Sequence, residues 1–329
     1  MTHVALDTLA MANPLAPASA PLGPFTTGPV LANPVDVLDD RALPLALPHA
    51  HLERVATGCR WAEGPVWFPL HNTLVWSDIP EDRMLYWRTD GSTGVFRAPS
   101  RHSNGNTRDP QGRLVTCEHG SRRVTRTEHD GSLTVIAERY DGRRLNSPND
   151  VVVTRDGAIW FTDPIYGILS LYEGAPAEPE QPTRNVYRVD PHSGQIAIVA
   201  DDFGQPNGLC FSPDERTLYI ADSGRSHGFA DGHHVRAFDV AEGRLRNGRV
   251  FAVIEPGVPD GMRVDARGNL WSSAADGVHV FAPDGSPIAK LRVPEAVANL
   301  TFGGPKGNRL FITATTSLYA LYVGVSGAA

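Results

Sequence analysis

Short apolar runs separated by turns recur along most of the chain. Each copy begins at a polar residue, continues as an apolar-rich strand, reaches a Gly or polar turn and resumes as an apolar strand with an aromatic residue. Ala158–Phe161 and Thr217–Ile220 are two such second strands. Because Asp-Gly, Pro-Asp and Gly signals join the members of each pair, the pattern predicts β-hairpins. No apolar 3.6-residue period lasts for the length of a helix.

Six copies of this pattern follow one another, and their polar starting residues are Glu63, Asn104, Asn149, Asn207, Asp260 and Asn299. The starts lie 39 to 58 residues apart, which is the spacing expected for four-stranded propeller blades. A two-sheet sandwich would not account for six copies of one start signal. The pattern therefore predicts an all-β fold, a six-bladed β-propeller.

The two ends of the chain are predicted to meet in the last blade. Its final hairpin is Arg309–Thr313 with Ser317–Tyr322, and Leu52–Ala56 can add the outer strand. Such a seam removes an open sheet edge. Residues 1–48 then form a Pro/Ala-rich N-terminal arm, and residues 49–329 form one propeller domain. Segment 163–185 departs most from the pattern and is predicted to be a surface loop, with a lid over the channel mouth as an alternative.

Composition narrows the classes of partner. The net charge of −7 with scattered Arg residues argues against nucleic acid, and no apolar run is long enough to span a bilayer. The arm has no Lys or Arg before Arg41, and Pro residues interrupt its apolar stretches. It is therefore not read as a secretory signal, and a cytoplasmic location is expected. Three distant cysteines, Cys59, Cys117 and Cys210, indicate buried packing groups rather than a disulfide framework.

The six starting residues predict a metal site. The first strand of each propeller blade lines the central channel, so these side chains should form a ring at one mouth. Converging buried oxygens are costly unless a cation satisfies them. Carboxylates and carboxamides favour calcium or magnesium, and Glu63 with Asp260 would balance two positive charges. We expect one divalent metal, with Ca²⁺ favoured and Mg²⁺, Mn²⁺ or Zn²⁺ as alternatives; the competing interpretation is that Asn-Gly and Asp-Gly only form turns.

Four segments resemble the signature segments of the SMP-30/gluconolactonase/LRE-like family: Ala62–Pro65, Ser147–Asp150, Pro206–Leu209 and Pro259–Met262. They occur in the family order, and segments around Asn104 and at Phe161–Gly167 resemble the bacterial gluconolactonase branch. The resemblance implies a six-bladed propeller and hydrolysis of a sugar lactone to the aldonic acid. It also implies metal ligation by Glu63, Asn149, Asn207 and Asp260.

Residues that border the mouth are candidates for substrate binding: Asn104, His119, Asp163 and Tyr166. A neutral imidazole near a metal can move a proton or hydrogen-bond a sugar hydroxyl, although a single His at a strand end is often a packing residue. Asp163 and Tyr166 stand at the root of segment 163–185. The cluster His227, His233 and His234 is expected in a solvated Gly-rich loop rather than at a metal.

The expected chemistry is attack of water on the lactone carbonyl. A metal would polarise that carbonyl, and Asp260 is predicted to act both as a ligand and as the general base. Two alternatives remain open at this stage. One is hydrolysis of organophosphate triesters at the same centre, and the other is a non-catalytic, calcium-stabilised propeller that binds a ligand.

Overall fold

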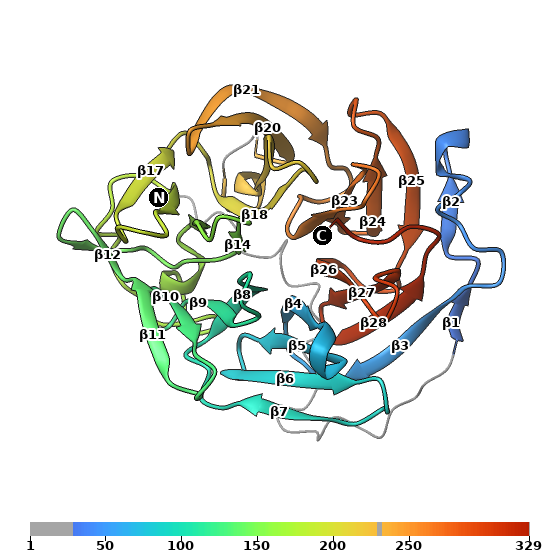
Figure 1. The fold of residues 1–329 in the computed structure, drawn as a ribbon, viewed down its shortest axis with the longest axis horizontal. Helices are drawn as coiled ribbons and strands as arrows, with labels where there is room; N and C mark the ends of the chain where they lie inside the picture. Colours follow the sequence, from blue (N-terminus) through green and yellow to red (C-terminus); the bar gives the residue numbers. More distant parts are fainter. Residues whose placement is uncertain (1–28, 229–231, 329) are drawn as a thin grey trace, which may run out of the picture.

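Six antiparallel sheets surround a central axis in the computed structural model, which describes residues 29–228 and 232–328 (Figure 1). Within each sheet the first strand of the repeat is innermost, and the other three lie successively farther out. The predicted six-bladed β-propeller is therefore confirmed. The six sheets are called blades 1 to 6 in chain order.

The strands of the first three blades have the following bounds. Blade 1 contains β4 (Ala62–Phe68), β5 (Thr73–Asp78), β6 (Arg83–Arg88) and β7 (Thr93–Arg97); blade 2 contains β8 (Ser103–Arg108), β9 (Leu114–Glu118), β10 (Arg123–Thr127) and β11 (Leu133–Ala137); blade 3 contains β14 (Val151–Val153), β15 (Ile159–Asp163), β16 (Asn185–Val189) and β17 (Ile196–Ala200).

The last three blades complete the ring. Blade 4 contains β18 (Pro206–Phe211), β19 (Thr217–Asp222), β20 (His234–Ala241) and β21 (Arg244–Val253); blade 5 contains β22 (Met262–Val264), β23 (Leu270–Ala274), β24 (Gly277–Phe281) and β25 (Pro287–Arg292); blade 6 contains β26 (Val297–Gly303), β27 (Arg309–Ala314), β28 (Ser317–Tyr322) and β3 (His51–Thr57). Short elements outside the four-strand pattern are β12 (Arg139–Tyr140), β13 (Arg143–Arg144), η1 (Asp40–Ala42), η2 (Pro69–His71), η3 (Tyr166–Ile168) and η4 (Gly224–His227).

Blade 6 joins the two ends of the chain, as the sequence predicts. Strand β3 pairs antiparallel with β28, with Ala56 opposite Leu318. The part of the arm that the structure describes adds further strands: β1 (Pro29–Ala32) pairs with β3, and β2 (Val35–Val37) pairs with β25. The arm thus covers the outer edges of blades 5 and 6. Residues 1–28 of the predicted arm lie outside the described residues.

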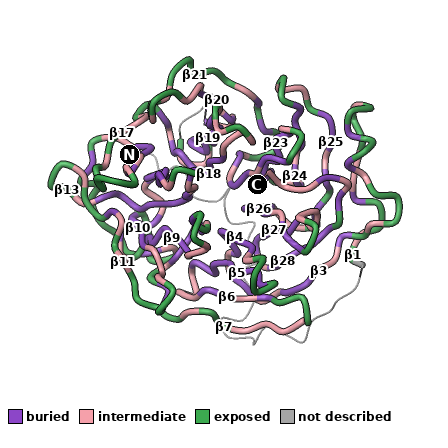
Figure 2. Tube along the Cα trace, in the orientation of Figure 1, coloured by how far each residue is buried: buried purple, intermediate pink, exposed green. Residues whose placement is uncertain are grey.

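The hydrophobic core fills the spaces between neighbouring blades. Trp76, Trp160 and Trp271 are almost fully buried in the second strands of their blades, where alternate side chains of a strand face the adjacent sheet. Where the ring closes, Trp67 of blade 1 stacks on Phe311 of blade 6 with ring centroids 5.5 Å apart. Burial is greatest on the inner strands and lowest on the outer ones (Figure 2). All three cysteines are buried and unpaired, which agrees with a packing role.

Segment 163–185 forms a connection across the mouth end of blade 2. We call its residues 164–184 the strap. Near its start, Gly167 donates its N–H to Ser147 Oγ (3.0 Å) and its α-carbon packs beside His119 at the end of β9. At its far point, the Tyr172 hydroxyl donates to the main-chain oxygen of Arg60, just before blade 1 (3.3 Å). The strap therefore runs from blade 3 past blade 2 to blade 1.

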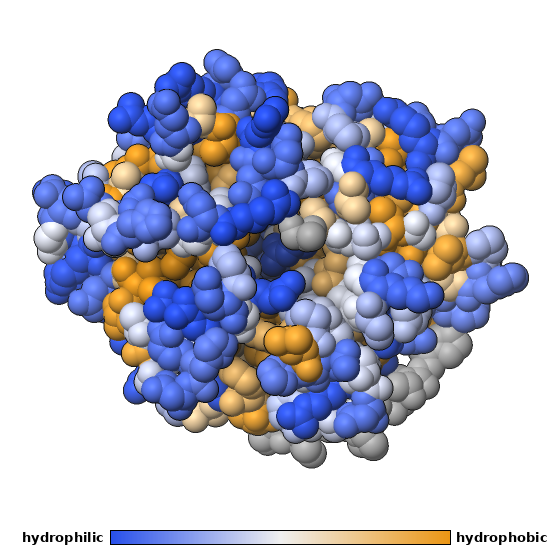
Figure 3. Space-filling model, viewed as in Figure 1, coloured by the Kyte–Doolittle hydropathy of each residue, from blue (hydrophilic) through white to orange (hydrophobic). Residues whose placement is uncertain are grey.

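The outer surface is predominantly polar. Hydrophilic residues surround the centre of the ring on the face seen in Figure 3, and hydrophobic residues occur there in scattered patches. No helix in the described part of the chain is long and apolar enough to cross a membrane.

Candidate active site at the channel mouth

The structure brings the six polar starting residues together at one end of the channel, called the mouth. Five of them are at most 5% exposed, and Asp260 is partly buried. Neighbouring blades are linked directly at this level. Asn299 Nδ2 of blade 6 donates to Glu63 Oε2 of blade 1 (3.1 Å), and the N–H of Gly105 in blade 2 donates to Asn149 O of blade 3 (2.8 Å).

Close contact between blades explains why glycine follows several of the starting residues. A Cβ at Gly208 would lie 2.1 Å from the main-chain oxygen of Asp260 in the next blade, and a Cβ at Gly64 would lie 2.1 Å from Asn104 O. No side chain fits such gaps, so the inner strands approach one another only where glycine stands. The Asn-Gly and Asp-Gly pairs thus allow close packing around the channel, and a turn-forming role does not account for them.

Three carboxylates lie near enough at this end of the channel for their charges to interact: Glu63, Asp150 and Asp260. Burial, with a smaller contribution from the nearby charge of Asp150, raises the pKa of Glu63 to about 8. Burial also raises the pKa of Asp260 well above its usual range, with Glu63 and Asp150 adding repulsion. Burial is also the main cause of the raised pKa of Asp150. Like charges this close need a positive partner to ionise together.

The residues at the mouth fit a hard divalent cation. Asn207 Oδ1 is buried and has no hydrogen-bond partner among the described residues, while Asn207 Nδ2 is held by Ser223 Oγ (3.1 Å). A free carbonyl oxygen next to clustered carboxylates is the donor set that Ca²⁺ and Mg²⁺ prefer. Within the described residues no three His, Cys, Asp or Glu side chains group in a metal-binding arrangement; the predicted set instead combines Glu63 and Asp260 with two carboxamides.

Sequence reasoning did not assign a role to Asp150. Its side chain is 1% exposed, Oδ1 accepts the N–H of Val151 (2.9 Å), and Oδ2 has no hydrogen-bond partner in the described structure. The guanidinium of Arg263 is the nearby positive charge, and its Nη1 lies 4.0 Å from Asp150 Oδ2. Asp150 occupies the position where the other repeats of the Asn-Gly or Asp-Gly type have glycine. This replacement of glycine by aspartate is the sequence signal that could have identified Asp150 as a functional residue.

His119 and Asn104, two of the predicted substrate residues, contact each other. His119 has no exposed surface, and its Nε2 lies 3.3 Å from Asn104 Nδ2. Burial lowers the pKa of His119 to about 3, so the imidazole is neutral. Its Nδ1 has no hydrogen-bond partner among the described residues. The pair can therefore accept or donate a hydrogen bond at the mouth.

Tyr166 and Asp163 lie in different surroundings. The Tyr166 hydroxyl is buried without a partner in the described structure, and its pKa is raised by burial and by nearby Asp260, which places it beside the ring. Asp163 has no exposed surface, and its Oδ2 accepts the N–H of Asn146 (2.8 Å). This carboxylate holds the loop that leads to Asn149. Its contact with substrate stays a prediction.

A second carboxylate that sequence reasoning missed is Glu173 of the strap. Glu173 Oε2 lies 3.6 Å from His119 Nδ1, and its side chain is 24% exposed. Burial raises the pKa of Glu173 to about 7, and its charge contributes to the raised pKa values of Glu63 and Asp260. No local pattern in the sequence identifies this residue, because only the path of the strap brings it to the mouth.

The segment Gly224–Gly228 has the pattern Gly-x-Ser-x-Gly of serine hydrolases. The structure places Ser226 in η4, a short 3₁₀ turn after β19, rather than at a strand-to-α-helix turn. Ser226 Oγ donates to Ser223 O (2.8 Å) and lies 2.7 Å from His227 Nδ1, while the His227 ring packs edge-on against Tyr166 (5.0 Å). These local contacts do not form a nucleophile elbow.

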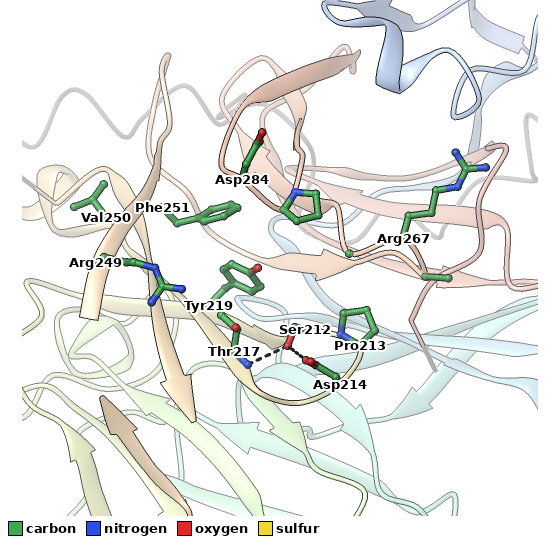
Figure 4. A pocket seen from close by; sticks show the side chains of 13 residues that line it. Ser212, Pro213, Asp214, Thr217, Tyr219, Arg249, Val250, Phe251, Arg267 and Asp284 are labelled. Carbon is green, nitrogen blue, oxygen red and sulfur yellow. Dashed lines mark hydrogen bonds between the residues drawn. The ribbon is translucent and has the colours of Figure 1, made fainter. Parts of the chain in front are cut away.

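A cavity of about 720 Å³ lies away from the mouth (Figure 4). It is formed by the β18–β19 and β22–β23 turns and by β21, at the opposite end of blades 4 and 5. Tyr219, Phe251, Arg249 and Arg267 line it. Because it contains none of the ring residues, the polar mouth and not this cavity is the candidate active site.

Comparison with known proteins agrees with this geometry. The model of the SMP-30/Gluconolactonase/LRE-like region matches residues 61–316. The chain is 34% identical over 284 residues to a gluconolactonase of Zymomonas mobilis subsp. mobilis, covering 80% of this chain and 79% of that protein. It is 30% identical over 270 residues to a pentonolactonase of Haloferax volcanii, covering 79% and 83%. A solved gluconolactonase structure from Xanthomonas campestris has 40% identity and a TM-score of 0.83, covering 93% of this chain and 98% of that one. The chain belongs to the SMP-30/gluconolactonase/LRE-like family.

Proposed function

We propose that this protein hydrolyses a gluconolactone-like sugar lactone to the corresponding aldonic acid, with one divalent cation held at the mouth. The observation that carries the proposal is the gathering of Glu63 and Asp260 at the channel mouth with Asn207 Oδ1, which has no partner within the described residues. Burial, and for Asp260 also the charge of Glu63, raises the pKa of both carboxyl groups. Relatives named gluconolactonase and pentonolactonase support the substrate class. A small-molecule lactone is thus the proposed partner.

Glu63, Asn149, Asn207 and Asp260 would hold the cation, and Ca²⁺ suits their oxygens best. When bound, a divalent cation polarises a carbonyl and stabilises negative charge on its oxygen. The protein's own residues would do the remaining work. Asn104, with the neutral His119 against it, hydrogen-bonds the sugar hydroxyls, and the Tyr166 hydroxyl adds a further donor. The Asp260 carboxylate removes a proton from the attacking water.

The test is hydrolysis of D-glucono-1,5-lactone, followed with a pH indicator, by chelator-treated protein before and after addition of Ca²⁺. We expect turnover that depends on Ca²⁺ and is lost in Glu63→Gln and Asp260→Ala. Asp201→Asn, an exposed carboxylate, is the matched control and should keep wild-type turnover.

Two results would count against the proposal. Faster turnover of a phosphotriester than of any lactone would make the protein a phosphotriesterase. A rise in melting temperature with Ca²⁺, together with no turnover of lactones or phosphotriesters, would make it a binding protein. Full turnover in Asp260→Asn with retained Ca²⁺ affinity would remove Asp260 as the base and leave the lactonase assignment standing.

A further inference from the structure

The strap places the carboxylate of Glu173 beside His119 at the mouth. Tyr172 anchors the strap to Arg60 immediately before Glu173, and after it the N–H of Ala175 donates to Gly167 O (3.1 Å). A Cβ at Gly174 would lie 2.2 Å from Gly167 O. The main chain on both sides of Glu173 is therefore fixed, so the position of its carboxylate over His119 is built into the fold.

The Glu173 carboxylate approaches His119 Nδ1 at 3.6 Å, which is longer than a hydrogen bond, and is 24% exposed. The groups around it are His119, Tyr172, Tyr166, Glu63 and Asp260, which are neutral or acidic. In these surroundings the protonated form is favoured, in agreement with a pKa near 7.

Opening a sugar lactone requires a second proton transfer that the base does not provide. After water adds to the carbonyl carbon and Asp260 takes one water proton, the bond from that carbon to the ring oxygen breaks. The electron pair of that bond stays on the ring oxygen, which departs as an aliphatic alkoxide. An alkoxide is a poor leaving group, so a positioned acid that protonates it accelerates this step.

We propose that Glu173 is the general acid of this reaction, delivering its carboxyl proton to the departing ring oxygen. The inference rests on the proposed lactonase function. The transfer turns the ring oxygen into a hydroxyl group and Glu173 into a carboxylate. Asp260 then loses the proton taken from water, and Glu173 regains one from solvent, so the net reaction is lactone plus water to hydroxy acid.

His119 is the positioning residue for Glu173. His119 Nε2 lies 3.3 Å from Asn104 Nδ2, so Nε2 accepts from the amide and the neutral imidazole donates from Nδ1 towards an ionised Glu173. With Glu173 protonated, the other tautomer accepts at Nδ1, and the Asn104 amide turns over so that its oxygen accepts from Nε2–H.

The experiment compares two lactones that differ in the leaving group. D-glucono-1,5-lactone releases an aliphatic alkoxide, whereas dihydrocoumarin releases a phenolate that leaves without a proton. In Glu173→Gln, kcat for gluconolactone should fall about 100-fold, the scale of general-acid catalysis, while kcat for dihydrocoumarin should change by less than about 3-fold. Glu178→Gln, an exposed carboxylate on the same strap, should leave both rates unchanged.

A second measurement separates catalysis from structure. In the wild type, kcat for gluconolactone should decline above neutral pH, and this decline should be absent in Glu173→Gln. If dihydrocoumarin is not turned over, this comparison alone tests whether Glu173 is the general acid. The melting temperature of Glu173→Gln should equal or exceed that of the wild type at pH 8. Equal losses on both lactones, or an unchanged alkaline decline, would overturn the role of Glu173. No lactone turnover by the wild type would instead overturn the proposed function.

Discussion

At the scale of single residues, the mouth combines groups that water would normally satisfy but that the fold removes from water. Asp150 Oδ2, Asn207 Oδ1 and His119 Nδ1 are all buried without hydrogen-bond partners in the described structure. Such groups destabilise a protein unless a ligand or ion satisfies them. Their concentration at the mouth indicates that this end of the channel is shaped for binding and not for stability.

Asp163 provides a residue-scale prediction of pH dependence. Burial raises its pKa from the ordinary 3.8 to about 7 in the folded protein, so the unfolded chain ionises first. The stability lost through Asp163 therefore grows as pH rises from about 4 to 7 and is complete above 7. Asp163→Asn removes this loss. We expect the difference in melting temperature between Asp163→Asn and the wild type to increase by about 3 °C or more from pH 5 to pH 8.

The measurement is thermal unfolding of both proteins at the two pH values. Asp201→Asn, on the surface, serves as the control and should give the same difference at pH 5 and pH 8. A difference for Asp163→Asn that does not depend on pH would show that its carboxylate stays ionised in the folded protein.

At the scale of strands, the inner strands of neighbouring blades pack without space for side chains. Gly208 and Gly64 each face a main-chain oxygen of the next blade across 2.1 Å, measured from an added Cβ. The hydroxyls of second strands complete these contacts; Ser77 Oγ donates to Asn104 O (2.8 Å) and Thr162 Oγ1 donates to Asn207 O (2.8 Å). The width of the mouth is consequently set by backbone contacts.

Gly208→Ala tests this packing. The added methyl group meets a main-chain oxygen, which cannot rotate away as a side chain can, so the strands must separate. We expect a loss of about 1–3 kcal/mol in the free energy of unfolding, measured by urea denaturation. Gly131→Asn, in an exposed turn with φ +86° and no atom near an added Cβ, should be almost neutral because Asn tolerates this conformation. An unchanged stability for Gly208→Ala would mean that the inner strands can move apart freely.

The sequence predicts the blades well because each repeat is a local hairpin whose start and turn are visible in a short window. It also predicts the seam, since Leu52–Ala56 precedes the first repeat and the final blade lacks a fourth strand. The ring of six polar residues follows from the same register. Pairing of β1 with β3 and of β2 with β25 was not predicted, because such short strands carry little pattern of their own. Glu173 and Asp150 were missed because their roles depend on the path of the strap and on contacts between blades.

At the scale of the whole molecule, the ring closes through β3. Leu52 and Val55 of this strand are almost fully buried in the core, and Ser317 Oγ donates to Thr57 Oγ1 between the two ends of the chain (3.0 Å). No covalent bond closes the circle in the described structure, where all cysteines are free. The ring is therefore closed by non-covalent contacts, among them the pairing of β3 with β28.

Two truncations test the contribution of this pairing. Removal of residues 1–48 deletes β1 and β2, and we expect it to lower the melting temperature while unfolding stays cooperative. Removal of residues 1–58 deletes β3 as well, exposes the edge of β28 and takes away the three buried side chains of β3; we expect no cooperative transition by circular dichroism. A cooperative melt of the shorter protein near the wild-type temperature would show that the propeller is stable without the fourth strand of blade 6.

The distance along the chain between β3 and its partner also has a consequence for biosynthesis. Thr57 and Ser317 are 260 residues apart, so β3 leaves the ribosome long before β28 exists. At 5–20 residues per second, this strand waits for roughly 10 to 50 seconds. Blades 1 to 5 have all their own inner strands by then, and each consists of local hairpins that form quickly. We expect the pairing of β3 with β28 to be the last step of folding, with the nascent chain most exposed to aggregation just before it.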